Sequence, residues 1–164
     1  MRQDAAGRTV TAWEPRETPW LGIVLGYGPM LPFLAGAAGA WWLGGDLGRG
    51  LATLTVLWAC AILLFLSGVR RGVSFRQEGG ETLFQIATML GLFCLGFAAL
   101  VATWLGREPL ALVLLILGYL AIAVLDPVAA RRGEAPLFFA RLRPLQMPLA
   151  IVSLAALMAL RLTA

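Results

Sequence analysis

Five stretches of this chain are each long and apolar enough to cross a membrane as a helix. A crossing needs about 20 mostly apolar residues, so the last two stretches lie near the short limit. Only 13% of the 164 residues are charged and 60% are hydrophobic, whereas a soluble domain carries about 25% charged residues. The sequence therefore predicts an all-α membrane protein, a bundle of five transmembrane helices. The expected spans are residues 20–43, 50–69, 82–104, 109–125 and 145–160.

The arginines predict the orientation of the bundle. With five spans, the tail at residues 1–19 and the loops at 70–81 and 126–144 share one side. Ten of the 13 cationic residues lie in these segments, and only Arg49, Arg107 and Arg161 lie on the other side. Cytoplasmic loops are rich in Lys and Arg. We therefore expect a cytoplasmic N-terminus and a periplasmic C-terminus.

The N-terminal tail indicates the membrane in which the chain resides. It contains Asp4, Glu14 and Glu17, whereas mitochondrial transit peptides are poor in acidic residues. The first apolar stretch is rich in Gly and Pro, which favours a retained span over a cleaved signal peptide. We expect a multi-pass protein of the bacterial inner (cytoplasmic) membrane.

Two prolines interrupt the first span within the sequence LGYGPMLPF, at residues 25–33. Pro29 and Pro32 have no N–H group, so each leaves one carbonyl of the preceding turn without its helical donor. Such a break can bind an ion or an anionic head group, as in transporters with discontinuous helices. The alternative is a simple kink, in which Ser67 or Tyr119 donates to the freed carbonyls. The candidate broken-helix site is Tyr27, Gly28, Pro29 and Pro32.

Small residues recur four positions apart in the same span. Gly22 and Gly26 form one such pair, and Gly36 and Ala40 form a second. Pairs of this kind let helix backbones approach closely in a membrane. We expect Gly22 and Gly26 to contribute to docking on a partner.

Polar residues of the spans gather near the predicted cytoplasmic side. Asp126 ends its helix at the depth of Arg70 and Arg71, and a charge in the membrane generally needs a partner. One interpretation is an ion pair of Asp126 with Arg70 or Arg71. In the other, Asp126 caps a turn while both arginines extend towards lipid phosphates. The candidate polar cluster is Arg70, Arg71, Ser67, Asp126, Gln85 and Gln146.

The last loop contains a short amphipathic segment at residues 135–143. At helical spacing, its aromatic and cationic side chains would lie on the anionic inner leaflet or on a partner surface. The side chains expected to face lipid or a partner are Phe138, Phe139, Arg141 and Arg143.

Several of these segments resemble a known family. LGYGPMLPFLAGA, AILLFLSGVRRG, LDP and RLRPLQMPLAIVSL look like successive signatures of the family with domain of unknown function 3429. That family of small integral membrane proteins includes the mitochondrial transmembrane protein 69, and the likeness covers about residues 18–160. FLSGVRRG is similar to the family pattern SFLGGxRWG, with Arg71 at the Trp position. The resemblance implies a five-helix fold and gives weight to Arg70, Asp126 and Arg143, but implies no activity.

The sequence favours a binding or assembly role over catalysis. The chain has no His, no Cys beside a base and no phosphate-binding glycine loop. We expect no enzyme activity, cofactor, metal or nucleic-acid partner. We expect contacts with the lipid bilayer, anionic lipid head groups and other membrane protein subunits. The favoured hypothesis is an accessory, assembly or stabilising subunit of a larger inner-membrane complex. The alternative is a small carrier or lipid-handling protein with a cytoplasm-facing polar pocket.

Overall fold

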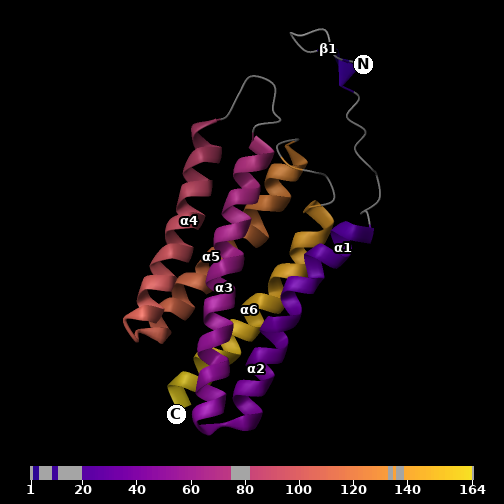
Figure 1. Cartoon of the computed structure of the whole chain (residues 1–164). Coiled ribbons are helices and arrows are strands. Elements are labelled where there is room, and N and C mark those ends of the chain that lie inside the picture. The colour runs from indigo at the N-terminus through magenta and orange to yellow at the C-terminus, as the bar shows by residue number, and fades with distance from the viewer. Residues whose placement is uncertain are drawn as a thin grey trace.

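Helices make up nearly all of the described chain in the computed structural model (Figure 1). The structure describes residues 2–3, 9–10, 20–74, 82–132, 135 and 139–163. The short strands β1 (Arg2–Gln3) and β2 (Thr9–Val10) pair antiparallel, with Arg2 opposite Val10. The helices are α1 (Trp20–Tyr27), the 3-10 turn η1 (Gly28–Met30), α2 (Leu31–Leu43), α3 (Gly45–Ser74), α4 (Leu83–Trp104), α5 (Glu108–Arg131) and α6 (Phe139–Thr163).

The prediction of five helices with the length and apolar character of membrane spans is confirmed. The segment from α1 to α2 forms the first, and α3 to α6 form the others; all five are long and apolar enough to cross a membrane. Several extend beyond their expected bounds, because a helix does not stop where the apolar run stops. The 30 residues of α3 correspond to about 45 Å, more than the hydrocarbon core of about 30 Å.

The helices form a ring in which α3 also touches α5 (Figure 1). Around the ring, α2 packs on α3, α3 on α4, α4 on α5, α5 on α6 and α6 on α2. At one end of the bundle α3 and α5 finish and α4 and α6 begin. We call this the arginine-rich end, because its described residues include Arg70, Arg71, Arg131, Arg132, Arg141 and Arg143. Whether this end faces the cytoplasm remains a prediction.

At the opposite end, two tight turns join neighbouring helices. Gly44 and Gly45, between α2 and α3, have φ angles of 56° and 53°, and Gly106, between α4 and α5, has a φ angle of 70°. These left-handed conformations favour glycine, since it has no Cβ. The turns therefore fix α2–α3 and α4–α5 as antiparallel hairpins.

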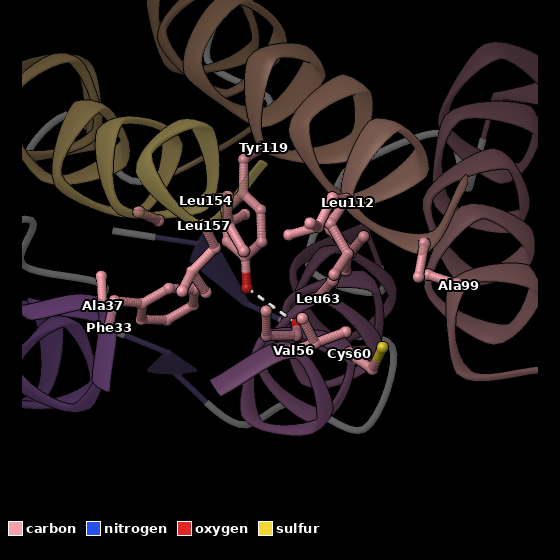
Figure 2. Close-up of a cluster of buried hydrophobic side chains, with 14 of the residues drawn as sticks. Phe33, Ala37, Val56, Cys60, Leu63, Ala99, Leu112, Tyr119, Leu154 and Leu157 are labelled. Carbon is pink, nitrogen blue, oxygen red and sulfur yellow. Dashed lines mark hydrogen bonds between the residues drawn. The ribbon is translucent and has the colours of Figure 1, made fainter. Parts of the chain in front are cut away.

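The centre of the bundle is filled by side chains from α2, α3, α4, α5 and α6 (Figure 2). Tyr119 of α5 is fully buried, and its hydroxyl donates to the carbonyl of Ala59 on α3 at 2.9 Å. Its ring meets the edge of Phe33 with the centroids 5.5 Å apart. Burying a tyrosine requires a partner for its hydroxyl, so this bond fixes α5 against α3.

Small residues of the first span bring helices together inside the chain. A Cβ on Gly36 would lie 1.9 Å from the Thr55 hydroxyl on α3, and a Cβ on Gly26 would lie 2.9 Å from Leu142 on α6. Gly26 is buried, and Gly22 is only partly exposed. The expectation that Gly26 docks on a partner is therefore wrong, because α6 already covers it.

The described part of the expected amphipathic segment at residues 135–143 belongs, from Phe139 onward, to the last span. Helix α6 begins at Phe139 and continues through Pro144 and Pro148. Transmembrane helices tolerate proline where neighbouring groups satisfy the freed backbone. Phe138 lies outside the described residues.

Candidate functional site

Asp126 is the centre of a buried ionic cluster at the arginine-rich end. It lies in the last two turns of α5, directly before Pro127, and is only 4% exposed. Its Oδ1 accepts a hydrogen bond of 2.6 Å from Nη1 of Arg70 on α3. Its Oδ2 lies 3.1 Å from Nε of Arg143 on α6. The Nε–H group is not aligned for a hydrogen bond, so this second contact is an ion pair.

The structure thus shows the ion pair between Arg70 and Asp126 that helix direction and depth predicted. It does not show Arg70 extended away from Asp126 towards lipid. Arg70 stands near the end of α3, and its side chain is 13% exposed. We call Arg70, Asp126 and Arg143 the ionic cluster.

Arg143 is not on the lipid-facing surface where we expected it. It is 5% exposed, because the register of α6 turns its side chain towards α5. Its Nη1 donates to Oε1 of Gln146 at 3.0 Å, and its guanidinium carbon lies 4.6 Å from the centre of the Phe139 ring. Phe139 is therefore partly buried against this arginine, whereas Arg141 is exposed as expected.

Gln146 connects the ionic cluster to the break in the first span. It is 2% exposed, and its Nε2 donates to the carbonyl of Gly26, the penultimate residue of α1. The cluster therefore links four segments of the chain, namely α1, α3, α5 and α6. Only α3 and α6 contact the carboxylate of Asp126 on α5 directly, and Gln146 connects α1 to this group through Arg143.

Two other carbonyl groups at the break also have donors. The indole Nε1 of Trp58 on α3 donates to the carbonyl of Pro29 at 3.0 Å. The N–H group of Leu31 donates to the carbonyl of Gly28, which is the bond of a 3-10 turn. This geometry favours the kink over an ion-binding break. Tyr27 and Pro29 are partly buried, and Gly28 and Pro32 are exposed.

The donors that we expected at the kink bind elsewhere. The hydroxyl of Ser67 donates to the carbonyl of Leu64, one turn back in its own helix. The hydroxyl of Tyr119 donates to Ala59, as described above. Both expectations are wrong, because side chains that lie close in depth need not point at the same helix.

Gln85 and Arg71 complete the set of predicted polar residues. Gln85 is buried at the start of α4, where its amide and backbone groups form a capping box with Thr82. A capping box satisfies N–H groups that the first turn of a helix leaves free. Arg71 is partly buried beside Arg70 in sequence. Of the six predicted polar residues, Arg70, Asp126 and Gln146 join Arg143 in the contacts of the ionic cluster described above.

The ionic cluster carries a formal charge of +1, from two guanidinium groups and one carboxylate. Desolvation of ions is costly unless they are paired and hydrogen-bonded. Among the described residues, Asp126 is the only carboxylate at the arginine-rich end; Asp46 and Glu108 begin helices at the opposite end. One positive charge is therefore left without an anion in the described part of the chain.

A second cross-helix cluster lies at the opposite end and was missed from the sequence. Glu108 at the start of α5 pairs with Arg161 near the end of α6, and the hydroxyl of Thr53 on α3 also donates to Glu108. The signal was available, since antiparallel neighbours bring the start of one helix beside the end of the other. The short link between α4 and α5 places Glu108 at that level.

The described residues contain no cluster of typical metal ligands. Within them, no group of three His, Cys, Asp or Glu side chains could hold a metal ion. No family model matches the chain, and no curated protein or solved structure matches it significantly. The resemblance to the family with domain of unknown function 3429 therefore remains a prediction.

Proposed function

We propose that this protein is a non-catalytic accessory or stabilising subunit of a larger complex in the bacterial inner membrane. The observation that carries the proposal is a stripe of small side chains on the outer face of α4. Its members are Ala87, Gly91, Cys94 and Ala98, all of them exposed. We call this set the α4 stripe.

The spacing of the α4 stripe places its members on one narrow face. Positions separated by four, three and four residues lie nearly above one another on a helix with 3.6 residues per turn. A Cβ on Gly91 would meet nothing within 4 Å. Two exposed aromatic rings, Phe93 and Phe97, stack beside the stripe with their centroids 6.3 Å apart. The small face therefore runs next to an aromatic ridge.

This shape is suited to another helix. In a membrane, helices associate through close van der Waals packing, which small residues allow and large residues prevent. Helix α4 stands at the edge of the bundle (Figure 1), and only 22% of its most apolar stretch is buried, against 44% in α3 and α5. It is the span with most surface left for a partner.

The arrangement of the polar groups also favours an assembly role over a carrier. Asp126, Arg143 and Gln146 are buried and bind one another or the backbone. A small carrier with a cytoplasm-facing polar pocket would need polar groups that bind and release a solute. Groups committed to holding four segments together are better suited to a rigid subunit.

The proposal is tested by affinity purification of the chain from its native membrane in mild detergent. We expect an integral membrane protein of different sequence to purify with it in fixed stoichiometry. Gly91→Leu should abolish this association, because the leucine fills the small face. Ala159→Leu is the matched control, since Ala159 is also exposed but lies on α6. It should leave the association unchanged.

Two results would contradict the proposal. The first is a wild-type chain that purifies alone after crosslinking in native membranes. The second is equal loss of the partner in Gly91→Leu and Ala159→Leu, which would mean that bulk anywhere on the surface disrupts the complex. Solute movement by the purified chain in liposomes would instead favour the carrier.

A further inference from the structure

We propose that the ionic cluster is a binding site for a phosphate group, supplied by an anionic membrane lipid at the arginine-rich end. Arg70 supplies the ligand contact, and Arg143 holds Asp126 from the other side. The proposal is independent of the α4 stripe and of any protein partner.

The two arginines of the ionic cluster carry more charge than its one carboxylate balances. Asp126 neutralises one of the two arginines, and the described residues at this end contain no other carboxylate. A cation shielded from water is costly without an anion beside it. An anionic ligand that approaches Arg70 would bring the cluster to neutrality, so binding and stability of the bundle should be linked.

The guanidinium group of Arg70 has N–H donors that Asp126 does not use. A guanidinium group carries five N–H donors in a planar fork that matches carboxylate and phosphate oxygens. Arg70 uses Nη1 for Asp126, and its other N–H groups make no hydrogen bond to the described part of the chain. With 13% of its side chain exposed, Arg70 is open to a ligand from outside, whereas Arg143 is enclosed.

The ionic cluster lies close to the ends of α3 and α5. Arg70 lies four residues before the end of α3, and Asp126 lies five residues before the end of α5. These positions are at the level where a spanning helix meets lipid head groups. The exposed Arg131, Arg132 and Arg141 at the same end would raise the local concentration of anionic lipid. Lipid phosphate lies at this level and is the anion that we assign to Arg70.

The test uses the full chain, purified and stripped of lipid in a neutral detergent. Its thermal stability is measured with phosphatidylglycerol, with diacylglycerol that lacks a phosphate, or with inorganic phosphate. A ligand at 100 times its Kd should raise the Tm by about 5–10 °C. We expect this rise with phosphatidylglycerol and not with diacylglycerol, and native mass spectrometry should show one retained phospholipid.

The variant Arg70→Gln should lose most of the rise. It should still fold, because Asp126 and Arg143 remain as a neutral pair. Arg131→Gln is the matched control, since it removes the same charge from an exposed position at the same end. It should keep the rise, whereas a general surface attraction would be weakened equally by both changes. Should Arg70→Gln fail to fold, Arg70→Lys serves instead and should bind phosphatidylglycerol with at least threefold lower affinity.

Each remaining outcome has a definite meaning. If inorganic phosphate alone reproduces the rise, the site takes a free phosphate and the lipid source is wrong. If diacylglycerol reproduces it, or if Arg131→Gln loses as much as Arg70→Gln, the cluster is not a phosphate site. These results come from the isolated chain, so they do not depend on whether the α4 stripe binds a partner.

Discussion

The ionic cluster makes an asymmetric prediction about its members. Asp126→Asn keeps the size of the side chain but leaves Arg70 and Arg143 close together with no anion between them. Removal of one partner from a buried pair costs about 3–5 kcal/mol, so we expect a loss in this range. Arg70→Gln leaves Asp126 paired with Arg143, and should cost only about 1.5–3 kcal/mol, the value of a charged hydrogen bond.

The double variant separates the pair from its surroundings. In Arg70→Gln with Asp126→Asn, only Arg143 remains charged, so the repulsion that destabilises Asp126→Asn is gone. The double variant should therefore be more stable than the sum of the two losses by about 0.5–3 kcal/mol. The free energy of unfolding can be measured in mixed micelles by titration with a denaturing detergent, in the absence of phosphate and lipid.

Two results would show that Asp126 is not shared by Arg70 and Arg143 as described. One is strict additivity of the two losses, which would mean that Arg70 and Asp126 do not interact. The other is a larger loss for Arg70→Gln than for Asp126→Asn, which would mean that Arg143 does not share the carboxylate.

Three further predictions concern other parts of the bundle. Gly118→Ala should lower the free energy of unfolding by about 1–3 kcal/mol, since the added Cβ would lie 2.5 Å from Leu63, while Gly91→Ala should be tolerated because it meets nothing. Gln146→Leu should lower the free energy of unfolding by about 1–3 kcal/mol, because the Gly26 carbonyl loses its donor. A loss below about 0.5 kcal/mol would mean that another donor replaces Gln146. Reporter enzymes fused after Ala164 should be active only in the periplasm, and cytoplasmic activity would reverse the orientation.

The five helices could be predicted because the signal for a span is local. Length and apolar character are read from one stretch at a time, and the bilayer imposes both. The ends could not be predicted as well, since α3 begins at Gly45 and finishes at Ser74, well outside the expected 50–69. A helix can continue into the interface, where charged residues are tolerated, so composition does not mark its end.

The pair of Arg70 with Asp126 was within reach of the sequence, because helix direction fixes depth. The role of Arg143 was not, since it required the register of α6 relative to α5. Its neighbours contained a usable signal: Arg143 shares a helical face with Gln146, Met147 and Ala150, all of which are buried. Continuing the buried face of the last span upstream would have placed Arg143 inside the bundle. The donors at the kink were missed for a similar reason, because Trp58 and Gln146 come from helices whose rotation the sequence does not specify.

In the complex that we propose, the α4 stripe contacts another membrane protein, and Cys94 allows this contact to be tested in place. Cys94 is exposed in the middle of the stripe, whereas Cys60 is buried. A short crosslinker with a maleimide and a photoreactive group can therefore be attached at Cys94 in native membranes. We expect a covalent adduct with one membrane protein of different sequence, and none from the Cys94→Ser chain that carries Ala159→Cys. Adducts with lipid alone, or with a second copy of this chain, would contradict it.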